Sequence, residues 1–192
     1  MSVRTGAASA LVVATAGAVA FVTIVLFLGG FGDVFGTVGD VAVLVMTLAL
    51  APVMATWYEL GGRTPLRPAQ ASLASAVGAV LVFSAVQVLY LLGAVTFDLE
   101  SGATGAFAVE AVAVVVIGLW IGGASVLAGP WLTNGLRWFG AVAGVGVVLY
   151  AAGLLLGGVT HPLTFVGGVG YQVLLPIWAF LLARRWRGLR AG

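Results

Sequence analysis

The sequence has no cysteine, no lysine and only one histidine, which leaves few groups for metal, redox or covalent chemistry. Without cysteine there is no disulfide, thiolate metal site, iron–sulfur cluster or cysteine nucleophile. A single imidazole excludes bis-histidine haem ligation and a zinc site of several histidines. Without lysine, a retinal Schiff base is excluded as well. We therefore expect no metal and no cofactor.

Charge is also scarce, at 7% of the 192 residues, whereas an ordinary soluble domain is about 25% charged. Eight basic and six acidic residues give a net charge of +2, which cannot supply a basic face for nucleic acid. Apolar residues dominate instead, at 62% of the chain, with a mean hydropathy of +1.20. This composition is typical of an integral membrane protein.

Long apolar stretches predict the fold class. A membrane-spanning helix needs about 20 mostly apolar residues, and six such stretches are separated by short Gly, Pro or charged clusters. They predict an all-α bundle of six transmembrane helices in one domain, residues 1–192, with helices at 7–29, 39–58, 71–95, 106–127, 138–156 and 163–183. The first stretch follows Arg4, as in a signal peptide, but its apolar run is too long for one, so we expect an uncleaved helix.

The arginines predict the orientation of this bundle. If the connections alternate between the two sides, one side holds all eight: Arg4, Arg63, Arg67, Arg137, Arg184, Arg185, Arg187 and Arg190. That side also holds Glu59, while the other holds the remaining carboxylates: Asp33, Asp40, Asp98, Glu100 and Glu110. The positive-inside rule then predicts a plasma-membrane protein with both termini in the cytoplasm. Near the same boundary, an interfacial belt is expected from four indoles: Trp57, Trp131, Trp138 and Trp186.

Glycine and proline positions predict how the helices pack and bend. G-x-x-x-G motifs at 118–122 and 140–144 lie on the fourth and fifth helices, joined by a tight turn. Because lipid is as apolar as leucine, such small residues let helices associate by close packing, so we expect these two to cross closely. A dimerisation face is the alternative. Pro52 and Pro176 each remove a backbone donor within a span, which predicts a kink, either as architecture or as a hinge.

One carboxylate, Glu110, stands clearly inside a span, about four residues into the fourth predicted helix. A carboxylate at the bilayer centre costs about 2.5–3.5 kcal/mol, so such a residue usually faces the bundle interior. Further polar residues share its half of the membrane: Gln87, Tyr90, Tyr150 and Gln172. Together they predict an outward-facing polar pocket centred on Glu110. The alternative is that they hydrogen-bond between helices as structure alone.

Other sequence signals argue against catalysis and against a continuous pathway. The chain has no G-x-x-x-x-G-K-[ST] loop, no G-x-S-x-G elbow and no evident acid–base pair, so no catalytic residue is predicted, not even for a lipid-modifying enzyme. The cytoplasmic half shows no polar cluster comparable to that of Glu110. At the C-terminus, four arginines are expected to contact anionic lipid head groups: Arg184, Arg185, Arg187 and Arg190.

A set of small-residue and tryptophan motifs resembles a known arrangement. The motifs are Gly118-Leu-Trp-Ile-Gly-Gly, Gly129-Pro-Trp-Leu, Leu136-Arg-Trp-Phe-Gly, Gly144-Val-Gly and Pro176-Ile-Trp. They are similar to families of small polytopic prokaryotic membrane proteins that carry a domain of unknown function. The resemblance covers mainly the last three helices. It implies a six-helix plasma-membrane bundle and supplies no catalytic residues.

These observations predict a non-enzymatic, multi-pass membrane protein that acts as a binding, sensing or accessory component. Its expected partners are membrane lipids and either another protein or a second copy of the chain, while no small-molecule ligand is indicated. The alternative is a small transporter or channel, in which Glu110 binds a proton, a cation or a polar solute.

Overall fold

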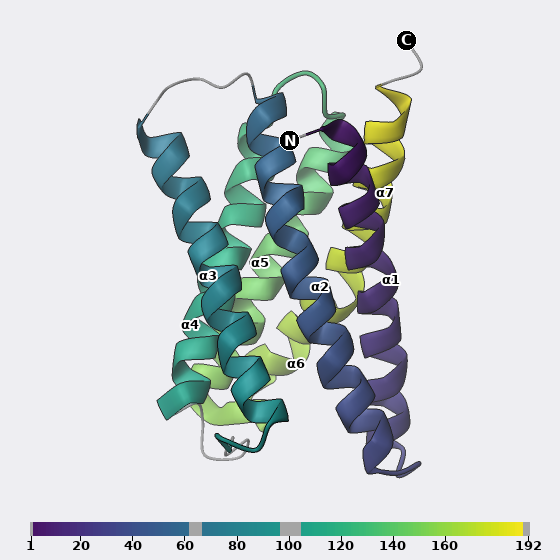
Figure 1. Cartoon of the computed structure of the whole chain (residues 1–192), viewed down its shortest axis with the longest axis vertical. Helices are drawn as coiled ribbons and strands as arrows, with labels where there is room; N and C mark the ends of the chain where they lie inside the picture. The colour runs from purple at the N-terminus through teal and green to yellow at the C-terminus, as the bar shows by residue number, and fades with distance from the viewer. Residues whose placement is uncertain (1, 62–66, 97–104, 190–192) are drawn as a thin grey trace.

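In the computed structural model, which describes residues 2–61, 67–96 and 105–189, six helical segments are long and apolar enough to cross a membrane. The first five are α1 (Val3–Leu28), α2 (Asp33–Leu60), α3 (Arg67–Leu91), α4 (Gly105–Leu127) and α5 (Asn134–Gly157) (Figure 1). A short 3-10 turn, η1 (Gly158–Thr160), leads to the sixth, which consists of α6 (Pro162–Val169), the π-helical turn η2 (Gly170–Leu174) and α7 (Leu175–Gly188). The predicted all-helical, six-span fold is confirmed.

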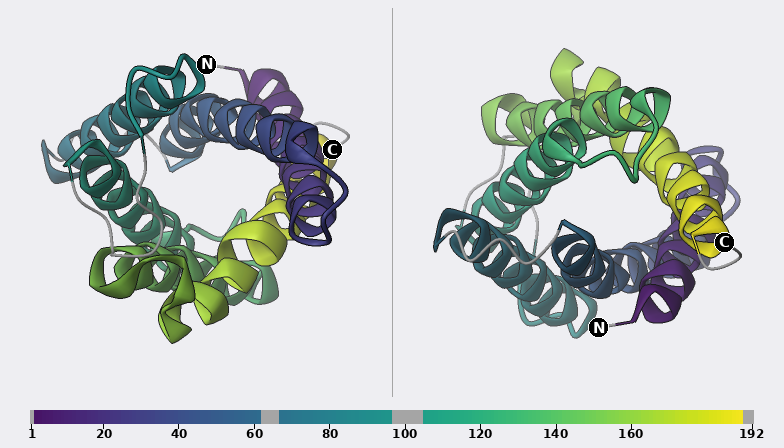
Figure 2. Two further views of the ribbon diagram at one scale, coloured as in Figure 1. Left: turned by 90° about the horizontal axis from the view of Figure 1, so that it is seen from below. Right: turned by 90° about the horizontal axis from the view of Figure 1, so that it is seen from above.

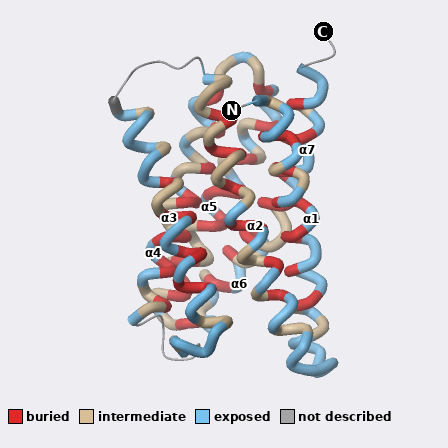
Figure 3. The backbone as a smooth tube through the Cα atoms, viewed as in Figure 1, coloured by how far each residue is buried: buried red, intermediate tan, exposed pale blue. Residues whose placement is uncertain are grey.

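The six spans form a closed ring. Each packs against its neighbours in chain order, and the ring closes because α7 and η2 pack against α1. The views along the bundle axis in Figure 2 show this arrangement from both ends. One core cluster of buried side chains draws on all six spans, and the buried positions follow the inward faces of the helices (Figure 3). A polar side chain that faces the interior is therefore removed from both lipid and water.

The two ends of the bundle differ in charge. The terminal end holds the start of α1, the end of α7 and the helix ends on either side of the α2–α3 and α4–α5 connections, and the far end holds the opposite ends of these helices (Figure 1). Five arginines with described side chains lie at the terminal end: Arg4, Arg137, Arg184, Arg185 and Arg187. Three carboxylates lie in the far half: Asp33, Asp40 and Glu110. Arg63, Arg190, Asp98 and Glu100 lie outside the described residues. The one-sided arrangement of arginines holds for the part of the chain that is described.

The helix α2 begins six residues before the predicted start, because its glycines pack against α1 instead of forming a loop. A Cβ on Gly39 would lie 3.0 Å from Thr23 Oγ1, and one on Gly36 would lie 3.3 Å from the Phe27 ring. The helix starts at Asp33, whose carboxylate suits the positive end of the helix dipole. It then continues through Pro52 as one α-helix.

The predicted close crossing of α4 and α5 is confirmed. A Cβ on Gly144 would lie 2.7 Å from Gly118 O and equally close to Gly122 Cα, so the two backbones are in direct contact. In contrast, a Cβ on Gly123 would meet nothing within 4 Å. Helix packing therefore requires glycine at position 144 but does not require it at position 123.

Near Pro176, where the sequence predicts a kink, the structure has the π-helical turn η2, which ends two residues before the proline. Pro176 is the second residue of α7, which continues directly from the π-helical turn. The turn starts at Gly170, where an added Cβ would lie 2.8 Å from the backbone carbon of Gly146 on α5. The π-helical turn therefore lies directly against the backbone of α5.

Replacing Gly144 by alanine tests the crossing. We expect Gly144→Ala to lower the free energy of unfolding by about 1–3 kcal/mol, because the methyl group would overlap backbone atoms that cannot move independently. The measurement is thermal unfolding in detergent. Gly123→Ala is the matched control and should be neutral or slightly stabilising, since alanine favours a helix over glycine by about 0.5–1 kcal/mol. Equal stability of the two variants would show that α4 and α5 do not cross so closely.

Candidate functional site

The carboxyl group of Glu110 is buried in the far half of the bundle. Glu110 lies five residues after the start of α4 and is 8% exposed, and its Oε2 atom has no hydrogen-bond partner. A buried polar atom without a partner carries a desolvation penalty of about 1–3 kcal/mol, and more when it is charged. Glu110 thus faces the interior, and one of its oxygens is left available there.

Four further residues, each from a different segment, lie within electrostatic range of this carboxyl group, and we call the five together the Glu110 cluster. The others are Asp40 on α2, Tyr90 on α3, Tyr150 on α5 and Tyr171 on η2. The rings of Tyr150 and Tyr171 stack with their centroids 5.1 Å apart and their planes 16° apart. The fold therefore places Tyr90 and Tyr150 within electrostatic range of Glu110, and the pocket that the sequence predicts around these residues stays a prediction.

The two glutamines of the predicted pocket lie beside this cluster. Gln87 is one turn before Tyr90 on α3 and is 4% exposed, and its Oε1 atom has no partner. Gln172 follows Tyr171 on η2 and is half-buried, and its Oε1 atom also has no partner. Both amides present unused acceptors, but no contact described here joins either of them to Glu110, so their part in a shared pocket stays a prediction.

Three members of this region were not part of the predicted pocket. The predicted helix start at residue 39 places Asp40 at the water-accessible end of a span, but α2 starts at Asp33, so Asp40 lies about two turns into the helix and is half-buried. Tyr171 is 5% exposed and Thr47 is 1% exposed, and their hydroxyl groups face each other without forming a hydrogen bond. The π-helical turn aims Tyr171 at α2 and α5, and π-helical turns are frequent at functional sites. No motif in the sequence predicts this π-helical turn.

A second group of residues, the indole cluster, occupies the interior of the terminal end. Four tryptophans surround Trp57, with ring centroids 4.7 Å (Trp131), 5.7 Å (Trp178), 6.3 Å (Trp120) and 6.3 Å (Trp186) from it. Trp57 and Trp186 are 6% and 0% exposed, so their prediction as an interfacial belt is wrong. Edge-to-face packing of the indoles inside the ring replaces contact with the head groups. Only Trp138, 69% exposed, has the surface position expected of a belt residue among these described indoles.

The region of the indole cluster also contains buried polar atoms, in the half of the bundle where the sequence predicts no polar cluster comparable to that of Glu110. Five buried atoms there have no partner: Trp131 Nε1, Trp178 Nε1, Trp186 Nε1, Thr56 Oγ1 and Ser125 Oγ. The indole nitrogens only donate hydrogen bonds, whereas the carboxylate and amide oxygens near Glu110 only accept them. Unused donors therefore predominate at the terminal end, and unused acceptors predominate in the far half.

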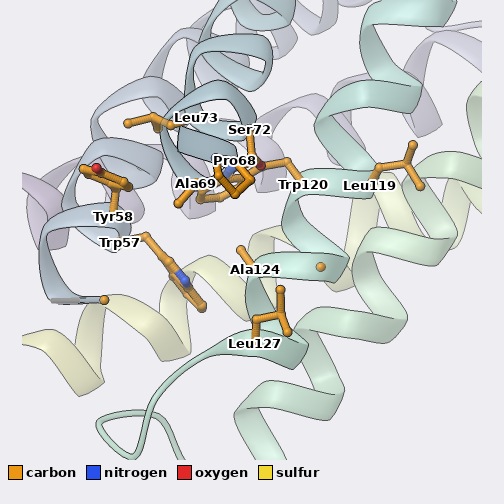
Figure 4. Close-up of a pocket in the computed structure, with 12 residues that line it drawn as sticks. Trp57, Tyr58, Pro68, Ala69, Ser72, Leu73, Leu119, Trp120, Ala124 and Leu127 are labelled. Carbon is orange, nitrogen blue, oxygen red and sulfur yellow. The ribbon is translucent and has the colours of Figure 1, made fainter. Parts of the chain in front are cut away.

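Two of the cavities formed by the described residues have linings that do not include Glu110. One, of about 420 Å³, lies between α2, α3 and α4 at the terminal end (Figure 4). The other, of about 310 Å³, lies between α1 and α2 and is lined mainly by valine and alanine. Neither is lined by Glu110, so the Glu110 cluster is a buried group of side chains rather than the wall of either cavity.

Comparison of the chain with known protein families, curated proteins and solved structures found no match. The resemblance of the last three helices to small prokaryotic membrane proteins stays a prediction. Function has to be argued from the geometry of the described residues.

Replacing Tyr171 by phenylalanine tests whether its hydroxyl group has a structural partner. Because the hydroxyl is buried and unpartnered, we expect Tyr171→Phe to leave the free energy of unfolding unchanged or to raise it by about 1 kcal/mol. Chemical or thermal unfolding in detergent measures this. Tyr58→Phe, at a partly exposed tyrosine of α2, is the control and should change stability by less than about 0.5 kcal/mol. A loss of more than about 1 kcal/mol in Tyr171→Phe would reveal a structural hydrogen bond.

Proposed function

We propose that this protein is a non-enzymatic, multi-pass membrane protein that binds a small cationic solute at the Glu110 cluster. The observation that carries the proposal is the unpartnered Oε2 of Glu110, which is buried within electrostatic range of Asp40. Two carboxyl groups in a site of low dielectric repel each other when ionised, and a cation between them removes that repulsion. A bound cation would also pair the orphaned oxygen.

The groups around Glu110 favour a cation that donates hydrogen bonds. Gln87 and Gln172 offer unpartnered Oε1 acceptors nearby, and Tyr171 offers an unpartnered hydroxyl group. Aromatic rings such as those of Tyr150 and Tyr171 attract cations through their negative faces. A small ammonium ion can donate hydrogen bonds to the amide, hydroxyl and carboxyl oxygens, whereas the carboxyl groups, when ionised, would repel an anion. We therefore favour an ammonium ion over an alkali cation as the ligand.

Binding of this kind serves a sensing or accessory component, and it also serves the alternative, a small transporter or channel. The indole cluster supports transport, because it adds unpartnered polar groups to the other half of the same bundle. Uptake of methylammonium into proteoliposomes separates the two functions. Uptake that Glu110→Gln abolishes indicates transport, while binding without uptake indicates a sensor or accessory component.

We further propose that the bundle lies in the plasma membrane with its terminal end in the cytoplasm. The arginines of that end support this orientation through the positive-inside rule. At the same end, Arg184, Arg185 and Arg187 provide contacts for anionic head groups, each contributing about 1 kcal/mol near the surface. Arg190, expected to act with them, lies outside the described residues.

A thermal-shift experiment tests cation binding. Purified protein in detergent is heated with methylammonium, sodium or potassium chloride at equal ionic strength. A bound cation should stabilise the fold by about 2.7 kcal/mol at a hundred times its dissociation constant. We expect one of these ions to raise the Tm of the parent protein and of Asp33→Asn, whose carboxylate is exposed at the far end, but not that of Glu110→Gln. An equal response of all three proteins, or no response, contradicts the proposal.

Single-cysteine labelling tests the orientation, since the chain has no cysteine of its own. Phe31→Cys lies at the far end and Asn134→Cys at the terminal end, both at exposed positions. A membrane-impermeant maleimide should label intact cells only through Phe31→Cys and should reach Asn134→Cys after permeabilisation. The reverse pattern would place both termini outside.

A further inference from the structure

The cavity of about 420 Å³ at the terminal end is a groove between three helices. Its lining includes Trp57, Ala69, Ser72, Leu119, Gly123 and Leu127. Figure 4 shows Trp57 projecting from α2 into the space that α3 and α4 bound on the other sides. Apart from the polar atoms of Ser72, Tyr58 and the indoles, the lining side chains are aliphatic or aromatic carbon. The groove is therefore built for an apolar occupant.

The groove opens toward the surrounding bilayer. On α4, Leu119 is 61% exposed and Leu127 is 84% exposed, and Gly123 between them is exposed as well. These residues belong to a helix long and apolar enough to span the membrane, so what lies against them is lipid. A groove of this shape at that depth is filled by the medium around it, which consists of acyl chains.

Positive charge lies at the end of one wall of the groove. The Arg137 side chain reaches back from α5, and its Nη2 donates a hydrogen bond of 2.5 Å to Val126 O in the last turn of α4. Val126 directly precedes Leu127, which lines the groove. A guanidinium group in this position attracts a phosphate at the membrane surface and leaves further N–H donors for it.

We propose that this groove binds an anionic phospholipid of the leaflet at the terminal end, with one acyl chain between α2, α3 and α4 and its phosphate beside Arg137. The apolar lining and the exposure of α4 favour an acyl chain, and the arginine favours a negatively charged head group. The site is separate from the Glu110 cluster, so it stands whether or not a cation binds there.

Filling the groove tests the proposal. Gly123 lines the groove, and a Cβ added there would meet nothing within 4 Å, so Gly123→Leu places a side chain in the groove without an internal clash. Gly78→Leu is the matched control, because a Cβ on Gly78 also meets nothing within 4 Å, but this residue of α3 lies outside the groove. Native mass spectrometry of detergent-purified protein measures binding of dioleoyl phosphatidylglycerol and, separately, of dioleoyl phosphatidylcholine.

We expect the parent protein and Gly78→Leu to bind one phosphatidylglycerol more tightly than phosphatidylcholine, and Gly123→Leu to bind it about tenfold more weakly. Unchanged phosphatidylglycerol binding in Gly123→Leu overturns the site. Equal binding of both lipids by the parent protein overturns the assignment of an anionic head group. Ala69→Leu narrows the groove from α3 and should show the same loss, so the proposal remains testable if Gly123→Leu does not fold.

Discussion

The structure depends on direct contact between helix backbones along α5. Lipid offers no hydrophobic drive for helices to associate, so close van der Waals packing has to hold them together. Gly144 brings α5 against α4, and Gly146 brings it against Gly170 at the start of the π-helical turn. Farther along, a Cβ on Gly153 would collide with the backbone of Thr164 in α6. One helix thereby fixes the positions of both neighbours and closes that side of the ring.

This packing also arranges the polar interior. Since Gly170 lies on the α5 backbone, the next residue, Tyr171, stacks on Tyr150 and faces the half of the bundle that contains Glu110. The ring keeps these groups from lipid, and several of their oxygens have no partner. At the other end, the indole cluster buries unpartnered N–H donors. Because unpaired polar atoms are costly in a low dielectric, each half favours a ligand or ordered water of complementary chemistry.

Much of the architecture follows from the sequence, because hydropathy and charge are properties of each stretch taken alone. The six spans and the buried position of Glu110 were predictable in this way, and the G-x-x-x-G motifs predicted the close crossing at Gly144. Features that depend on a partner helix and leave no local motif were not predictable. Glycines 36 and 39 suggest a loop until α1 is known to pack against them.

The tryptophans illustrate the same limit. A tryptophan near a membrane boundary suits a lipid-facing belt and a buried aromatic cluster equally well, and only the rotation of its helix decides between them. The side chains of Trp57 and Trp186 are buried in the bundle, whereas that of Trp138 is exposed on its surface. The π-helical turn was hidden for a related reason, since it reflects the contact between Gly170 and Gly146, residues far apart in the sequence. The pocket predicted from the sequence therefore contained only part of the candidate site, and it left out Tyr171 and Asp40.

An experimental structure in lipid nanodiscs, at a resolution that shows ordered ions and water, tests whether the bundle binds a cation in its interior. We expect density for a cation within about 3 Å of Glu110 Oε2, between the carboxyl groups and the stacked tyrosines. Interior cation binding is ruled out if the Glu110 side chain is paired with a neighbouring helix, or if it reaches out to the head groups with no density beside it.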